Sequence, residues 1–94
     1  MQIRWTKKAL RDFEQAVQYI ANDDPTAARK IVQKIWEDTQ LLRQHPGLGR
    51  PGRVEATREL VIPKLPFIIP YTEKNGIISI LRILHASRRW PESF

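Results

Sequence analysis

The apolar residues of this chain change their spacing once, on either side of a segment rich in glycine and proline. The segment covers residues 47–56 and, counted together with Pro46, contains three glycines and two prolines. Before this joint, apolar residues recur every three or four positions, as in helices, and after it β-branched residues form short runs, as in strands. We expect the joint itself to have no regular structure. Helices followed by strands favour an α+β domain.

Two amphipathic helices are predicted before the joint. The first begins after Thr6, a predicted N-cap, and carries an apolar stripe at helical spacing. The stripe consists of Leu10, Phe13, Val17 and Ile20. Asp24 and Pro25 begin the second helix, because aspartate caps helices well and proline suits the first helical position. The link between the helices is very short, so we expect an antiparallel hairpin.

Strands are predicted at the N-terminus and after the joint. Their ranges are 2–5, 57–62, 67–72 and 77–84. Asn75-Gly76 supplies a hairpin turn before the last strand. Pro70 cannot donate to a ladder, so we expect it to face a sheet edge or a bulge. Residues 1–94 are therefore predicted to form one domain, in which a short strand and a two-helix hairpin precede a three-stranded antiparallel sheet (β-α-α-β-β-β).

Composition limits the classes of function. The net charge is +6, and the surplus of basic residues lies mainly in residues 49–94, which carry eight Lys/Arg against four Asp/Glu. Such a surplus favours association with nucleic acid, ribosomes or acidic proteins, although it also serves solubility. The chain has no cysteine and only two, distant histidines, so we expect no metal and no cofactor. Without a membrane-spanning run or signal-peptide core, it is expected to be cytoplasmic.

Basic and aromatic side chains gather where the last predicted strand ends. They are Arg82, His85, Arg88, Arg89 and Trp90. Cleavage of RNA through its 2′-hydroxyl needs proton transfer and cations for the developing charge. His85 could transfer the proton, Arg82 and Arg88 could bind the phosphate, and Trp90 could stack on a base. Structural roles remain open, since Arg82 could pair with Glu59 and Trp90 could pack against the sheet or the helices.

Five ordered segments resemble the RelE/ParE superfamily of bacterial toxins from type II toxin–antitoxin modules. They are Asp24-Pro25-x-Ala27-Ala28, His45 to Arg50, Thr57 to Val61, Pro66 to Tyr71, and Ile80 to His85 with Arg88. The resemblance covers nearly the whole chain and implies a cognate antitoxin, which binds operator DNA together with the toxin. ParE-like members poison DNA gyrase, whereas RelE-like members are ribosome-dependent endoribonucleases that cut mRNA.

Two departures from the RelE-like pattern bear on this choice. RelE-like nucleases carry an arginine where this chain has Ile68, and paired lysines where it has Leu60 to Ile62. By analogy with a lost oxyanion donor, such a missing cation costs about 2–4 kcal/mol of transition-state stabilisation. The resemblance therefore implies ParE-like poisoning of gyrase. The alternatives are RelE-like cleavage of mRNA with His85, Arg82 and Arg88 in the site, and a non-toxic nucleic-acid-binding module.

Two sets of residues are predicted to contact partners. The set for the target or nucleic acid consists of Arg50, Arg53, Arg58, Lys64, Arg88, Arg89 and Trp90. The set for the antitoxin consists of Val32, Trp36 and Leu41, which widen the apolar stripe of the second helix beyond one face. These three residues either form an interface or fill the core, and both interpretations remain open.

Overall fold

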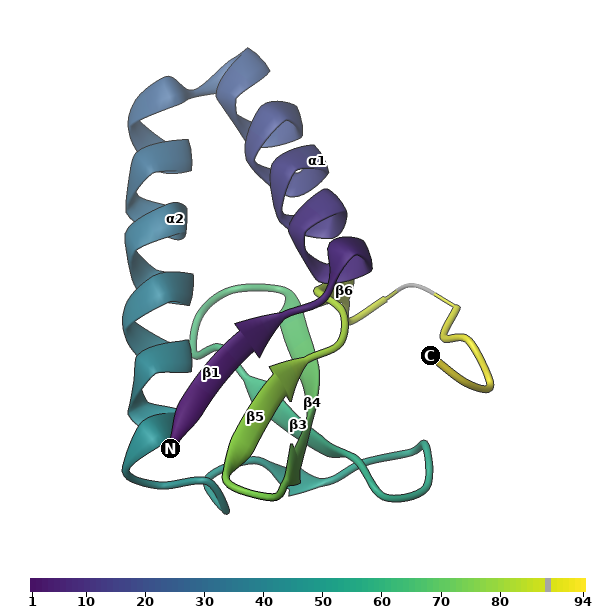
Figure 1. The fold of residues 1–94 in the computed structure, drawn as a ribbon. Helices are drawn as coiled ribbons and strands as arrows, with labels where there is room; N and C mark the ends of the chain where they lie inside the picture. Colours follow the sequence, from purple (N-terminus) through teal and green to yellow (C-terminus); the bar gives the residue numbers. More distant parts are fainter. Residues whose placement is uncertain (88) are drawn as a thin grey trace.

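The α+β fold is confirmed by a computed structural model that describes residues 1–87 and 89–94. In chain order the elements are β1 (Gln2–Trp5), α1 (Lys7–Asp23), α2 (Pro25–Gln40), the 3₁₀ helix η1 (Leu41–Arg43), β2 (Arg50–Pro51), β3 (Arg58–Val61), β4 (Phe67–Lys74), β5 (Ile77–Ile80) and β6 (Leu84–His85). Figure 1 shows α1 and α2 as a hairpin that extends beyond the sheet. Residues 89–94 lie on the side of the molecule away from α2. Neither helix is long and apolar enough to cross a membrane, within the residues described.

Both predicted helix caps are confirmed. The Thr6 hydroxyl accepts the Ala9 N–H at 3.1 Å and itself donates to the Leu81 carbonyl at 2.9 Å. The Asp24 carboxylate accepts the Ala27 N–H at 3.0 Å, and Pro25 follows it in the first turn of α2. Thr6 therefore both starts α1 and attaches it to the chain after β5, whereas Asp24 serves α2 alone.

Replacement of Asp24 tests how much its helix cap contributes to the free energy of unfolding. We expect Asp24→Ala to lower the free energy of unfolding by about 1 kcal/mol, because one amide of the first turn loses its acceptor. Chemical denaturation measures the change. The control is Asp23→Ala, which removes the neighbouring carboxylate from the last turn of α1 and should cause no loss. Equal losses in the two variants would contradict the assignment of the cap.

The sheet has more strands than predicted. Within residues 1–87 and 89–94 it has six, in the order β1-β5-β4-β3-β2, with β6 also paired to β4. The predicted strand at residues 2–5 is present, but it lies parallel to β5 in an otherwise antiparallel sheet. The expectation of no regular structure in the joint is wrong, because Arg50 and Pro51 form β2 against β3. Pro51 is tolerated there because β2 is an edge strand.

The last predicted strand, residues 77–84, is divided by a bulge opposite Pro70. Tyr71 pairs with Ile80 and Ile68 pairs with Leu84, so three steps along β4 face four steps along the other strand. One extra residue of this kind defines a β-bulge. The Leu81 N–H donates to the Pro70 carbonyl at 2.9 Å, so Pro70 faces the bulge, as expected from its missing N–H. The bulge takes residues 81–83 out of the ladder.

The hydrophobic core lies between the sheet and the two helices. Its fully buried side chains include Ile35, Leu42, Ile62, Ile69, Tyr71, Ile78 and Ile80. Trp5 packs on Phe13 with ring centroids 5.5 Å apart, and both rings border this core. Trp36, in contrast, is 54% exposed and lies on the surface. Leu10 is also exposed, at the edge of the predicted stripe. The core thus leaves apolar surface on both helices.

Candidate functional site at the basic end of the sheet

Arg82 lies in the bulge and binds Asp12 of α1. Its Nε is 2.6 Å from Asp12 Oδ2 and its Nη2 is 3.1 Å from Oδ1. The Ile83 N–H donates to Oδ2 at 3.0 Å. Arg82 therefore has a structural ion pair, but the suggested partner Glu59 is wrong. The hydrogen bonds to Asp12 raise the pKa of Arg82 against the lowering effect of burial. The Asp12 carboxylate therefore occupies one edge of this charged guanidinium.

Glu59 instead binds two arginines of the joint. Its side chain is 2% exposed; Arg50 Nε lies 3.1 Å from Oε1, and Arg53 Nε lies 3.9 Å from Oε2. The Arg53 backbone N–H also donates to Oε2, at 2.8 Å. Both arginine side chains remain about half exposed. A buried carboxylate therefore positions two cations that are still accessible to a partner.

Arg53 also contacts the C-terminal segment, through Trp90. Its guanidinium carbon lies 4.0 Å from the centroid of the Trp90 ring, a cation–π contact that neither interpretation of Trp90 had predicted. Among the residues that the structure describes, the buried Trp90 Nε1 has no hydrogen-bond partner. Since Arg53 covers one face of the ring, only the opposite face could stack on a base.

Of the remaining predicted cations, Arg58 lies with Arg50 and Arg53. Arg58 donates to the Gly49 carbonyl at 2.8 Å, which brings it to the joint beside Arg50 and Arg53. We call these three residues the joint cluster. Lys64 lies beyond the other end of β3, in the turn before β4, so it is not part of this cluster. Arg89 is exposed next to Trp90. Arg88 lies outside the described residues.

His85 and Arg82 lie at different hollows. His85 lines a cavity of about 590 Å³ bounded by α1, α2 and the start of β4, whereas Arg82 lines a separate hollow with Leu84 and Trp90. Ser87 Oγ is 2.7 Å from His85 Nδ1, and the Ser87 N–H donates to the same nitrogen at 3.2 Å. The ring stands edge-on to Phe67. These two hollows therefore separate His85 from Arg82.

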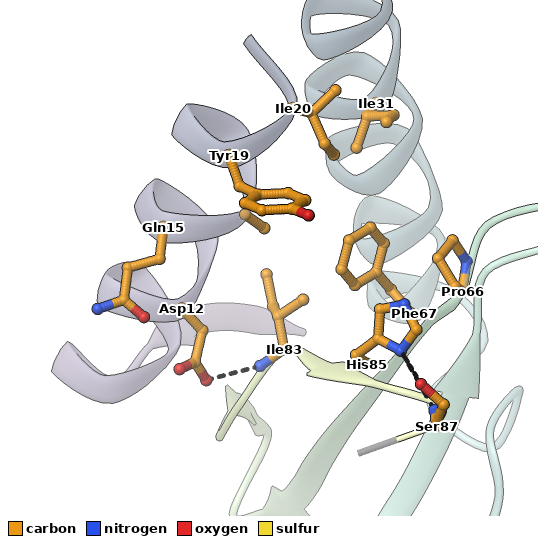
Figure 2. Close-up of a pocket in the computed structure, with 11 residues that line it drawn as sticks. Asp12, Gln15, Tyr19, Ile20, Ile31, Pro66, Phe67, Ile83, His85 and Ser87 are labelled. Carbon is orange, nitrogen blue, oxygen red and sulfur yellow. Dashed lines mark hydrogen bonds between the residues drawn. The ribbon is translucent and has the colours of Figure 1, made fainter. Parts of the chain in front are cut away.

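The cavity beside His85 is largely apolar. Figure 2 shows Ile20, Ile31 and Phe67 around it, with Tyr19 and Gln15 on its α1 side and Asp12 bonded to the Ile83 amide. Asp12 is the partner of Arg82 that the sequence did not reveal. It lies 70 residues from Arg82 in the chain, on the polar side of an amphipathic helix, so no local spacing connects the two. The described residues include no group of three or more metal-binding side chains.

The three residues predicted to contact the antitoxin do not form one patch. Leu41 lines a groove of about 440 Å³ with Leu48, Leu60, Val61 and Pro63, and neither Val32 nor Trp36 lines it. Because a helix turns by about 100° per residue, Trp36 of α2 and Leu41, five positions later at the start of η1, point in well-separated directions. Leu41 and Trp36 are each about half exposed, so neither serves to fill the core.

Comparisons with known proteins define the class of this molecule: it is a toxin of a type II toxin–antitoxin system. The sequence model of the family described as "ParE toxin of type II toxin-antitoxin system, parDE" matches residues 3–90. The chain therefore belongs to the ParE toxin family, and its partner in this context is a cognate antitoxin.

Individual relatives support this assignment over almost the full chain. Y4kP of Sinorhizobium fredii is 43% identical over 90 residues, which cover 96% of this chain and 93% of the relative. Toxin RelE2 of Caulobacter vibrioides is 31% identical over 87 residues, with coverage of 93% and 97%. A solved structure titled "Chromosomal ParDE TA system from P. aeruginosa" superposes with a TM-score of 0.85 at 33% identity, covering 93% of this chain and 97% of that one.

Proposed function

We propose that this toxin inhibits bacterial growth in the cytoplasm by ParE-like poisoning of DNA gyrase, without cleaving RNA. The observation that carries the proposal is the pairing of Arg82 with Asp12 at 2.6 Å. Cleavage of a phosphodiester needs cations aimed at the charge that develops in the transition state. Arg82, the cation best placed by sequence for that role, already has a carboxylate as its partner.

The strand beside Arg82 supports the same conclusion. Ile68, which stands where RelE-like nucleases carry an arginine, is 5% exposed and pairs with Val61 and Leu84. His85 lines a different cavity from Arg82. The second candidate function is ribosome-dependent cleavage of mRNA with His85, Arg82 and Arg88, and the printed name of the relative RelE2 favours it. It would require Arg82 to leave Asp12.

The joint cluster and the C-terminal segment form the proposed surface for the target. Arg50 and Arg53 are fixed by Glu59 but remain half exposed, and Arg89 lies beside the stacked Trp90. Positive charge on one surface accelerates association with an acidic partner and suppresses wrong ones. Operator DNA contacts the toxin only through the antitoxin complex in this proposal.

The antitoxin is proposed to use two separate apolar areas. One is the groove at Leu41 of η1, which apolar side chains line together with two ion pairs, Lys34 with Asp38 and Arg50 with Glu59. The other is the flank of α2 that carries Val32 and the exposed Trp36. Apolar anchors in a groove with a charged rim suit a segment with alternating apolar and charged side chains. Such a segment would have to pass around α2 to reach both areas.

Induced expression without the antitoxin tests the proposed function. We expect colony counts to fall, translated messages to stay intact in primer extension, and DNA breaks to depend on gyrase. His85→Ala should inhibit growth as strongly as the unchanged chain, and His45→Ala serves as the matched histidine control. Codon-spaced cuts that disappear in His85→Ala would instead establish the ribonuclease. Undiminished growth would reject toxicity itself.

A further inference from the structure

We infer that Arg82 and the backbone amide of Ile83 form an oxyanion-binding site, which the chain fills with its own Asp12 carboxylate. Asp12 is then a specificity-determining residue, because it excludes phosphate groups from the guanidinium. In the proposed function this exclusion directs the toxin away from nucleic acid. The inference concerns binding of small oxyanions by the purified protein, and it does not depend on which macromolecule the toxin poisons.

The donors around Asp12 are those of an anion site. Arg82 presents Nε and Nη2 side by side to the two carboxylate oxygens, at 2.6 and 3.1 Å. The Ile83 N–H adds a third donor to Oδ2 at 3.0 Å. A guanidinium edge matches two oxygens of a carboxylate or of a phosphate equally well. In a variant that lacks the Asp12 carboxylate, an oxyanion could therefore meet the same three donors.

The backbone that carries these donors is held by contacts that do not involve Asp12. The Leu81 N–H donates to the Pro70 carbonyl at 2.9 Å, and the Leu81 carbonyl accepts the Thr6 hydroxyl at 2.9 Å. Both bonds hold the bulge immediately before Arg82. On the other side, Leu84 pairs with Ile68 in the ladder. Removal of the Asp12 side chain should therefore leave the Ile83 amide and the base of Arg82 in place.

The site lies between two hollows. Asp12 lines the apolar cavity between the helices, and Arg82 lines the separate hollow with Leu84 and Arg89. Figure 2 shows the Asp12 carboxylate at the cavity wall, directed at the Ile83 amide. The two side chains are 11% and 23% exposed, so water competes only weakly for these bonds. A small anion that replaces the carboxylate would enter from the cavity side.

Thermal unfolding in the presence of inorganic phosphate tests this site. At 50 mM phosphate, compared with sodium chloride of equal ionic strength, Asp12→Ala should gain about 5 °C in its unfolding midpoint, as expected for a dissociation constant of about 10 mM. The unfolding midpoint of the unchanged chain should be the same in phosphate as in sodium chloride. The double variant Asp12→Ala with Arg82→Gln should not respond, and neither should Asp38→Ala, which removes the carboxylate of the more exposed pair with Lys34.

The outcomes separate this inference from its alternatives. No response of Asp12→Ala, or an equal response of the double variant, would overturn it. If Asp12→Ala unfolds in buffer alone, phosphate should refold it but not the double variant. Acetate forms a second arm: a response to either anion supports the site, and the stronger one identifies whether phosphate or carboxylate fits better. Growth inhibition by the unchanged chain is measured separately, so failure here leaves the proposed function standing.

Discussion

Gly49→Ala should lower the free energy of unfolding by about 3 to 5 kcal/mol, the sum of overpacking and of lost buried hydrogen bonds. A Cβ at this position would lie 2.6 Å from Tyr71 Cε1, 2.8 Å from the Tyr71 hydroxyl and 2.9 Å from the Glu59 carbonyl oxygen. Tyr71 is fully buried and Glu59 belongs to β3. Neither neighbour can move aside without disturbing the sheet.

The N–H and the carbonyl of Gly49 both form hydrogen bonds with side chains. Its N–H donates to the Tyr71 hydroxyl at 2.8 Å, and its carbonyl accepts from Arg58 Nη1 at 2.8 Å. A shift of the chain that relieves the clash would therefore lengthen one or both bonds. Loss of Arg58 from this position would also disperse the joint cluster, so the same change should weaken target contacts.

Thermal or chemical unfolding measures the effect of Gly49→Ala, with an expected fall in the midpoint of about 15 °C or more. Gly47→Ala is the matched control, because a Cβ there would meet no heavy atom within 4 Å. It should change the free energy of unfolding by no more than about 0.5 kcal/mol. Similar losses at both glycines would contradict the steric explanation.

Local features of the fold were predictable because their causes are local. A cap such as Thr6 or Asp24 acts on amides three residues away, and Pro70 indicated a sheet edge or a bulge through its own missing N–H. Pairings between distant segments were not predictable. Nothing in residues 2–5 specifies a parallel neighbour, and the residue inserted opposite Pro70 is visible only in the register of β4 with β5 and β6.

The residues of the candidate site were proposed from the sequence, and the one ion pair suggested for Arg82 was wrong. The sequence indicated which cations are exposed, but a chain with many arginines offers several partners for each buried carboxylate. Glu59 binds Arg50 and Arg53, while Arg82 binds Asp12. The choice follows from the bulge, which carries Arg82 toward α1. Lys64 was grouped with Arg58 by charge alone, although β3 separates them.

Tyr71→Phe should lower the free energy of unfolding by about 2 to 4 kcal/mol, because two hydrogen bonds lose one partner inside the protein. The Tyr71 hydroxyl donates to the Pro46 carbonyl at 2.7 Å and accepts the Gly49 N–H at 2.8 Å. It thereby attaches the joint to the centre of the sheet. Tyr19→Phe is the control, since Tyr19 is 77% exposed and should contribute no more than about 0.5 kcal/mol.

The same hydroxyl should make stability depend on alkaline pH. Burial raises the pKa of Tyr71 above the ordinary 10.0, although the Gly49 hydrogen bond and the charge of Arg58 oppose the rise. The unfolded chain loses this proton near its ordinary pKa, so the stabilising contribution is complete below about pH 10 and disappears as the pH rises through the folded-state pKa. Denaturation curves from pH 8 to 11 should therefore show a decline that is smaller in Tyr71→Phe and unchanged in Tyr19→Phe. Equal declines in all three proteins would assign the alkaline sensitivity to other groups, and Tyr71 would then be only a hydrogen-bonding residue.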